Sequence, residues 1–384
     1  MSSRVQRRVA IERRPHTVNL LWFRVGGALI GLVLAMAAVP LYASGDAGEL
    51  YSKLWAGTFG SALGWESVLV ASSPLVLTGL AASLPYRIGL WNVGGDGQMY
   101  MGAWVASAIA FSLPHLTQVA LIPAMLIGSV VGGMAWMVVP ALARAWLGVN
   151  EIVTTLMANF IALYWLTYWA SGPWAQKNSV GGVQSQFLPP QAALARVSLG
   201  PVSFHWGFLL AIAVAVAVAL VLRFTRVGFE LPILGAGERA GTYAGIPTRR
   251  RIAQVLLVGG ALGGLAGAVE MAGTVHQYSA AISDNTGYSG IVVAILAAGS
   301  ALGVLVIGVV FAAISVGGAV LTTNNVSPGV ATGLFGAVLL FAAVGDSLAR
   351  FRTSLVRRER RAPAGSPLDG PLPPAAEPIG APRA

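Results

Sequence analysis

Residues 302–322 read LGVLVIGVVFAAISVGGAVLT, a run of 21 residues without a charged side chain. An α-helix rises about 1.5 Å per residue, so a run of this length can cross the roughly 30 Å hydrocarbon core of a lipid bilayer. The run therefore predicts a transmembrane helix.

The whole chain shares this apolar character. Of its 384 residues, 56% are hydrophobic and only 10% are charged, whereas about 25% are charged in a typical soluble domain. Too few charged side chains remain to cover a soluble protein of this size, which excludes an ordinary water-soluble enzyme. The sequence contains no cysteine, which excludes disulfides, thiolate nucleophiles and cysteine-bound metals.

Apolar stretches of suitable length recur along the sequence and predict an all-α polytopic membrane protein with about ten transmembrane or broken helices. The eighth stretch is too short for a full span and predicts a broken or re-entrant helix. Three regions follow: a basic N-terminus at 1–21, a transmembrane domain at 22–350, and a tail at 351–384 that is first basic and then disordered and rich in proline and alanine. The ten stretches lie near residues 22–43, 66–84, 92–112, 119–140, 151–170, 204–222, 252–273, 288–299, 302–322 and 329–345.

Lysine and arginine are distributed unevenly between alternate loops. All but three of the 24 basic residues fall on one side of the predicted topology, and the exceptions are Lys53, Lys177 and Arg196. The positive-inside rule makes the basic side cytoplasmic, with both termini inside. A nucleic-acid-binding protein would instead gather its charge on one face of a folded domain. We therefore attribute the net charge of +10 to membrane topology and expect no nucleic-acid partner.

An internal repeat of the pattern N-x-G-x-x-G opens two apolar segments. Residues 92–97 read NVGGDG and residues 285–290 read NTGYSG. The predicted topology places the first copy on the cytoplasmic side and the second on the external side, which is typical of inverted-topology repeats. Asn92 and Asn285 could cap the helices that follow, or helix starts of this kind could face a polar solute. Both interpretations stay open at this point.

The cytoplasmic loop at 223–251 is long enough to form its own helix. A short amphipathic helix is predicted around 238–245, flanked by Gly235, Gly237 and Pro247. Such a helix could dock into a groove on another protein. The alternative is an ordinary solvated loop.

Two longer motifs resemble those of a known family. Residues 89–103, GLWNVGGDGQMYMGA, resemble F-N-I-G-x-E-G-Q-x-x-x-G-A, and residues 148–162, GVNEIVTTLMANFIA, resemble G-x-N-E-V-x-x-T-x-M-x-N-Y-I-A. Both are signatures of the inner-membrane permeases of ABC importers for nucleosides and simple sugars, within the branched-chain amino acid and ribose permease superfamily. The segment from Glu238 to Gly245 is similar to the coupling helix of this family. Asp96, Trp91 and Phe160 stand where the family usually has Glu, Phe and Tyr.

This resemblance implies one permease subunit in a larger importer of the bacterial inner membrane. The implied partners are a cytoplasmic ABC ATPase, a second and non-identical permease, an external solute-binding lipoprotein and the lipid bilayer. The sequence contains no G-x-x-x-x-G-K-[ST] phosphate-binding loop, so ATP and Mg²⁺ are expected on the ATPase, with no cofactor and no catalytic activity in this chain. The motifs are closest to those of nucleoside permeases, which favours a nucleoside over a simple sugar.

Two sets of candidate functional residues follow from the motifs and the resemblance. Polar and aromatic residues of the two motifs and the repeat are predicted to line the solute path: Trp91, Asn92, Asp96, Gln98, Asn159, Asn285 and Tyr288. Residues of the coupling segment are predicted to contact the ATPase: Glu238, Arg239, Ala240, Gly241 and Gly245.

Other functions remain as alternatives. A branched-chain amino acid ABC permease is the nearest one. An ion-coupled secondary transporter would bury paired acids at mid-membrane, where we expect none, because Glu151 is predicted at a helix start and Glu270 near the outer surface. A channel could also use glycine-rich re-entrant helices. The four histidines lack metal-binding spacing, which argues against a metalloenzyme.

Overall fold

The computed structural model describes residues 7–13, 20–38, 40, 47–176, 182–324 and 351–357, with scattered positions between 326 and 348. These residues form two units. In the smaller unit, strand β1 (Arg7–Arg13) pairs antiparallel with strand β6 (Phe351–Arg357), a pairing that the sequence analysis did not predict. The tail beyond residue 357 and about half of the predicted stretch 329–345 lie outside the described residues.

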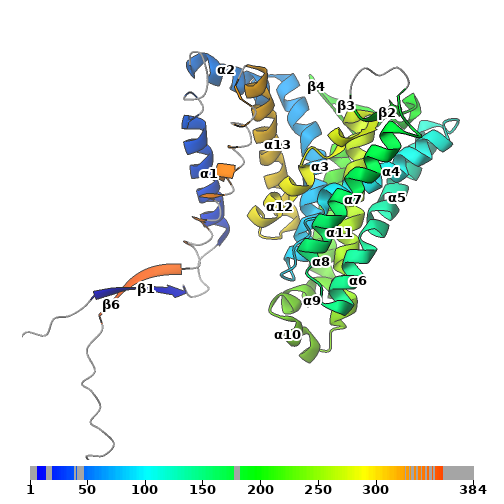
Figure 1. Ribbon diagram of the computed structural model, residues 1–384. Helices are drawn as coiled ribbons and strands as arrows, with labels where there is room; N and C mark the ends of the chain where they lie inside the picture. The colour runs from blue at the N-terminus through cyan, green and yellow to red at the C-terminus, as the bar shows by residue number, and fades with distance from the viewer. Residues whose placement is uncertain are drawn as a thin grey trace, which may run out of the picture. The chain divides into compact units, whose positions relative to one another are not determined.

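The larger unit is predominantly helical (Figure 1), and six of its described helical segments are long and apolar enough to cross a membrane. The predicted stretches up to residue 322 correspond to helices, and the short eighth stretch is an 11-residue helix. The helices are α1 (Leu20–Ala38), α2 (Ala47–Thr58), α3 (Ala62–Tyr86), α4 (Gly95–Ser112), α5 (Gln118–Trp136), α6 (Val138–Leu147), α7 (Glu151–Ser171), α8 (Gly207–Phe224), α9 (Arg226–Gly235), α10 (Glu238–Tyr243), α11 (Thr248–Glu270), α12 (Thr286–Leu296) and α13 (Ala301–Thr323).

Short elements fill the connections. A π-helical turn at Met271–Val275 follows α11, and 3₁₀ turns lie at Pro190–Ala192 and Ala280–Ile282. Strand β2 (Gln184–Phe187) pairs with β5 (Gln277–Ser279), and β3 (Arg196–Leu199) pairs with β4 (Val202–His205). The segment between α7 and α8 thus carries the short strands β2, β3 and β4.

Helices α3 and α11 form the centre of the helical unit. The most apolar 18-residue stretches of α3 and of the segment that contains α11 are 78% and 83% buried inside the protein, compared with 33% for that of α13. Helix α3 packs on α11, α12 and α13, while α11 packs on α4 and α5. Because Gly102, Gly133 and Gly264 meet where α4, α5 and α11 cross, the helix backbones approach closely, as small residues allow in membranes.

Gly264 offers a direct test of this packing. A Cβ atom added there would collide with the backbone oxygen of Ser129, which cannot rotate away as a side chain could. We expect Gly264→Val to lower the free energy of unfolding by at least ~1–3 kcal/mol, measured as thermal unfolding in detergent. Gly26→Val is the matched control, since a Cβ at Gly26 meets nothing within 4 Å. Equal stability of the two variants would contradict the close crossing.

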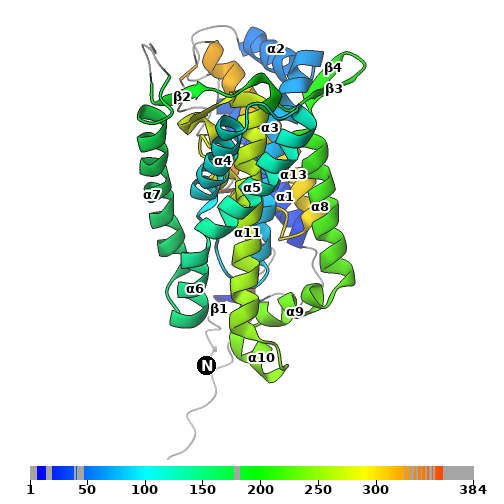
Figure 2. The same ribbon diagram turned by 90° about the vertical axis from the view of Figure 1, so that its right-hand side faces the viewer.

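The two ends of the helical unit carry different elements. Helices α6, α9 and α10 lie at one end, and α2 with strands β2, β3 and β4 lies at the other (Figures 1 and 2). Arg144 and Glu238, which were predicted on the cytoplasmic side, form an ion pair at the first end. Arg196 and Glu66 pair at the opposite end. The structure therefore separates the two predicted sides, and the orientation of these ends in the membrane stays a prediction.

His205 is a buried titratable group beside the predicted outer end. Its imidazole is 1% exposed, and its Nδ1 accepts a hydrogen bond from the Gly207 amide at 3.1 Å. Burial, followed by the charges of Arg196 and His276, lowers the pKa of His205 to about 4. The folded protein therefore keeps this imidazole neutral between about pH 4 and pH 6.5, where the unfolded chain protonates it.

This pKa shift predicts a pH-dependent stability. The unfolded chain binds more protons at this position between about pH 6.5 and 4, so the free energy of unfolding should fall by ~3 kcal/mol as the pH drops through that range. His205→Asn, which keeps an acceptor for the Gly207 amide, should weaken this dependence. Thermal unfolding in detergent at pH 7.5 and pH 5 measures it. Replacing the exposed His115 with Asn is the control, and an equal effect of both variants would contradict the assignment.

Candidate functional site

The two copies of the N-x-G-x-x-G motif meet inside the helical unit. Helix α4 begins at Gly95 and α12 begins at Thr286. A Cβ atom on Gly95 would lie 2.8 Å from the Gly287 Cα, and one on Gly287 would collide with the backbone nitrogen of Asp96. The backbones of the two helix starts are therefore in direct contact, which requires glycine at both positions.

Asp96 links the two helix starts. Its Oδ1 accepts hydrogen bonds from the Gly287 amide, at 2.8 Å, and from the hydroxyl of Ser283. The residue is 7% exposed. A carboxylate at a helix N-terminus satisfies an unpaired N–H group and is stabilised by the helix dipole. The α12 start is therefore satisfied by an acid from the other copy of the motif.

This arrangement corrects the local capping interpretation. Asn285 occupies the N-cap position of α12, but its side chain makes no capping hydrogen bond, and its backbone is left-handed with φ 64°. Asn92 is not at a cap position either, because the N-cap of α4 is Gly94. Asp96 and Glu151 are buried acids, and Glu270, expected near the outer surface, is only partly exposed. The expectation that no paired acids lie at mid-membrane stays a prediction.

Asn92 and Gln98 form a reciprocal amide pair. The Asn92 Nδ2 donates to Gln98 Oε1 at 3.2 Å, and the Gln98 Nε2 donates to Asn92 Oδ1 at 2.8 Å. Asn92 Oδ1 also accepts from the Gly94 amide at 3.1 Å. Both side chains are buried, so these bonds fix the conformation of the loop that leads into α4.

Asn159 connects α7 to both copies of the motif. Its Oδ1 accepts from the Gly97 amide at 2.9 Å, while its Nδ2 donates to the Val93 carbonyl at 2.9 Å and to the Tyr288 hydroxyl at 3.1 Å. One side chain therefore holds the start of α4 on both sides and reaches the first turn of α12.

The structure brings together five of the seven residues predicted to line the solute path: Asn92, Asp96, Gln98, Asn159 and Tyr288. The first four are buried, and their polar groups bond within the protein. Asn285 and Trp91 are exposed, and Tyr288 is half-buried. The buried residues hold the starts of α4 and α12 together, and the accessible residues are the ones that a solute could reach. Contact of these residues with a solute stays a prediction.

The predicted coupling segment forms a helix, preceded by helix α9, which was not predicted. Glu238 is the first residue of α10, and Arg239 is exposed beside it. Gly241 is buried against Leu234 of α9, and Gly245 takes the left-handed φ of 73° at the turn after the helix. The alternative of an ordinary solvated loop is therefore wrong, because residues Glu238–Tyr243 are helical, whereas contact with an ATPase stays a prediction.

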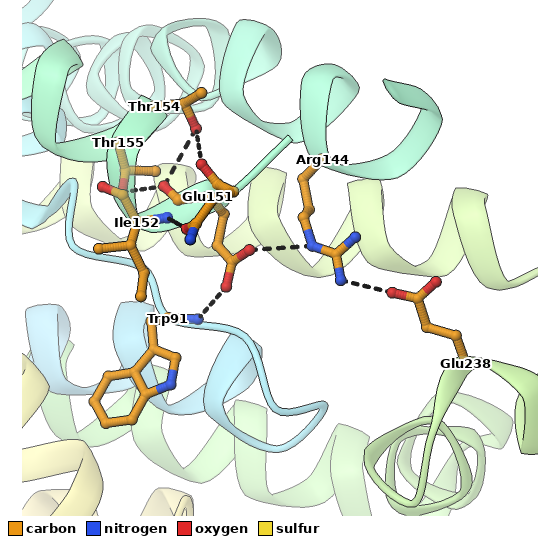
Figure 3. A network of polar contacts seen from close by, with 8 residues as sticks. Trp91, Arg144, Glu151, Ile152, Thr154, Thr155 and Glu238 are labelled. Atoms are coloured by element: carbon orange, nitrogen blue, oxygen red, sulfur yellow. Dashed lines mark hydrogen bonds and ion pairs between the residues drawn. The ribbon is translucent and has the colours of Figure 1, made fainter. Parts of the chain in front are cut away.

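A polar network joins this helix to the loop before α4 (Figure 3). Arg144 Nη2 contacts Glu238 Oε1 at 2.6 Å, and Arg144 Nε contacts Glu151 Oε2 at 3.1 Å. Glu151 Oε1 in turn accepts from the Trp91 amide at 3.1 Å. The predicted helix start at Glu151 is confirmed, and the Asn150 side chain caps α7 by accepting from the Ile152 amide at 2.9 Å. Sequence reasoning missed Arg144, whose only signal was its place in a short basic loop.

Within the described part of the chain, no group of three or more His, Cys, Asp or Glu side chains could hold a metal ion. The arrangement is a set of crossed helix starts braced by uncharged amides, one carboxylate and one ion-pair network. It can hold or move helices, and it offers polar and aromatic surface at Asn285, Tyr288 and Trp91.

Comparisons with known proteins agree with these features. A family model described as "Branched-chain amino acid transport system / permease component" matches residues 64–343. A glucose ABC transporter permease of Haloferax volcanii is 32% identical over 93% of this chain and 97% of its own length. A nucleoside ABC transporter permease of Lactococcus lactis is 28% identical over 83% of this chain and 88% of its own. A guanosine ABC transporter permease of Bacillus subtilis is 30% identical over 75% of this chain and 84% of its own.

Proposed function

This chain belongs to the family of permease components of branched-chain amino acid transport systems, and on that premise we propose that it forms the membrane path for a neutral hydroxylated solute, a nucleoside or a simple sugar. It is a multi-pass protein of the bacterial inner membrane and a permease subunit of an ABC importer, and it is not itself catalytic. In such systems ATP and Mg²⁺ belong to the ATPase partner.

The hydrogen bonding at the start of α12 supports the proposed class of solute. A zwitterionic amino acid needs a site for its carboxylate, and the N-terminus of a broken helix commonly supplies one in transporters. Here the Gly287 amide is already bonded to Asp96, so this amide is not available to the carboxylate of an amino acid. The accessible groups nearby are the amide of Asn285 and the phenol of Tyr288, which suit hydroxyl groups and a ring. This supports a neutral solute over an amino acid.

The repeated architecture supports alternating access. Each copy of the motif follows a long buried helix, α3 or α11, and each long helix packs on the helix that the other copy opens, α12 or α4. We assign these pairs to an inverted-topology repeat with its crossing at Gly95 and Gly287. Such repeats place the solute site near the repeat interface and let one half move against the other.

An exposed apolar surface supports the ATPase partner, and the other two partners rest on the family resemblance. The end that holds α9 and α10 exposes Phe229 and Tyr243, at 75% and 92%, and large exposed apolar side chains at a helix pair are typical of a docking surface. We assign this end to the cytoplasmic ATPase. We further assign a second, non-identical permease as the other half of the path and a solute-binding lipoprotein as the donor at the opposite end.

Reconstitution tests this function. Proteoliposomes that contain this chain, its second permease and its ATPase, supplied with the cognate binding protein, should take up radiolabelled guanosine or glucose when ATP is present. Leucine is the control solute for the amino acid alternative. Uptake should stop when either the ATPase or the binding protein is left out. Uptake of leucine but of neither guanosine nor glucose would contradict the proposal, and so would uptake driven by an ion gradient without ATP.

A further inference from the structure

We propose that Arg144 is a positioning residue that transmits movement of α10 to the crossing of α4 and α12, through Glu151 and the backbone of Trp91. The proposal rests on the importer function above, because α10 is the helix assigned to the ATPase. It goes further by naming the residues that carry the movement into the helical unit.

Arg144 occupies a junction between three elements (Figure 3). It lies in the last turn of α6, and two different nitrogens of its guanidinium contact Glu238 of α10 and Glu151 of α7. The planar guanidinium presents its N–H groups in a fixed fork, so a shift of one carboxylate reorients the contact to the other. Lysine, with a single ammonium on a flexible stem, lacks this rigid link.

Glu151 passes the contact on to the loop before α4. Its side chain is 9% exposed, and its two oxygens are divided between Arg144 and the Trp91 amide. Asn159, eight residues later and two turns along α7, holds the Val93 carbonyl and the Gly97 amide. Residues at this spacing lie on the same face of a helix. Helix α7 therefore bonds to the 91–97 segment at two positions along its length. A displacement of the start of α7 moves that segment.

The segment in turn bears on α12. Asp96, within residues 91–97, accepts hydrogen bonds from the Gly287 amide and the Ser283 hydroxyl. Ion pairs and a hydrogen bond thus link Glu238 to Trp91, the chain itself links Trp91 to Asp96, and the hydrogen bonds of Asp96 reach the start of α12. No step of this route depends on a contact outside the described residues.

The links differ in strength in a way that suits a switch. The Glu238 side chain is 55% exposed, and exposed ion pairs contribute little and are screened by salt. The Arg144–Glu151 pair is largely buried, and breaking such a pair leaves an uncompensated charge. The contact to α10 can therefore open and close during a transport cycle, while the inner part of the network stays together.

The experiment compares uptake with ATP hydrolysis in the complete reconstituted importer. Arg144→Lys keeps the charge but loses the fork, and it should reduce uptake at least tenfold while ATP hydrolysis stays within twofold of wild type. Glu238→Gln, at an exposed position, should likewise reduce uptake while ATP hydrolysis stays close to that of wild type. Lys53→Gln is the matched control, because it removes an exposed ion pair with Glu49 on α2, and it should change neither activity.

Hydrogen exchange gives a second readout that needs no solute. Addition of ATP to the assembled importer should change amide exchange in residues 90–97 of wild type, and this change should be lost in Arg144→Lys and Glu238→Gln. If the change persists in both variants, or if uptake and hydrolysis fall in parallel, Arg144 is only a structural brace and the proposal is overturned. Should Arg144→Lys fail to fold, Glu238→Gln decides on the same readouts. A wild-type importer that responds to ATP in this segment but moves neither guanosine nor glucose would refute the proposed solute and leave the relay standing.

Discussion

Replacement of Gly287 with alanine is expected to remove nearly all uptake by the reconstituted importer. A Cβ atom at this position collides with the backbone nitrogen and the carboxylate of Asp96 and with the backbone of Gly95. Backbone atoms cannot rotate aside, so α12 must move away from α4. That movement also breaks the hydrogen bond from the Gly287 amide to Asp96. Overpacking of this kind commonly costs ~1–3 kcal/mol in a protein interior, and the lost hydrogen bond adds ~1–3 kcal/mol for a buried group left unpaired.

The measurements are ATP-dependent uptake and thermal unfolding of the purified chain in detergent. Gly317→Ala is the matched control, because a Cβ there has its nearest neighbour at 3.6 Å, the Thr58 Cγ2. The control should transport and unfold like wild type. Normal uptake by Gly287→Ala would show that the two helix starts do not need their close contact during transport.

The helices could be predicted from the sequence because bilayer thickness sets the length of an apolar run. The run at 302–322 lies within α13, Ala301–Thr323, and the stretch at 288–299 corresponds to the short α12. The repeat of N-x-G-x-x-G also identified the two helix starts that meet. In each case, the signal is local in sequence and needs no knowledge of the partner segment.

The interactions of the site could not be predicted in this way. Capping rules are local, so they offered Asn285 as a cap for α12, whereas the Gly287 amide is bonded to Asp96, 191 residues from Gly287. A buried carboxylate stabilises this helix start better than an exposed amide with a left-handed backbone does. Arg144 served only as one of the basic residues that indicate the cytoplasmic side, because nothing near it in the sequence indicates that Glu238 is its partner. Helix α9 was missed because Pro232 interrupts its pattern.

Replacement of Asp96 with leucine is expected to produce the second large loss. Leucine is similar in size but accepts no hydrogen bond, so the Gly287 amide and the Ser283 hydroxyl would be left unpaired inside the helical unit. Each unpaired buried group costs ~1–3 kcal/mol, and uptake should fall by more than about tenfold for each 1.4 kcal/mol by which the transport-competent arrangement is destabilised. Uptake and thermal unfolding are measured side by side, and wild-type behaviour in both would contradict the bridging role of Asp96.

The comparison with Asp96→Asn separates hydrogen bonding from charge. Asparagine keeps an oxygen that can accept from the Gly287 amide and the Ser283 hydroxyl, although a neutral acceptor forms bonds about half as strong as a charged one. We expect a loss of about fivefold, equivalent to ~1 kcal/mol, and far less than with leucine. An ion-coupled carrier that binds its proton or sodium ion at this acid would instead lose all uptake in both variants, because neither side chain can be ionised. Retained, ATP-dependent uptake by Asp96→Asn would therefore assign this buried acid to holding two helix starts together and argue against ion coupling at Asp96.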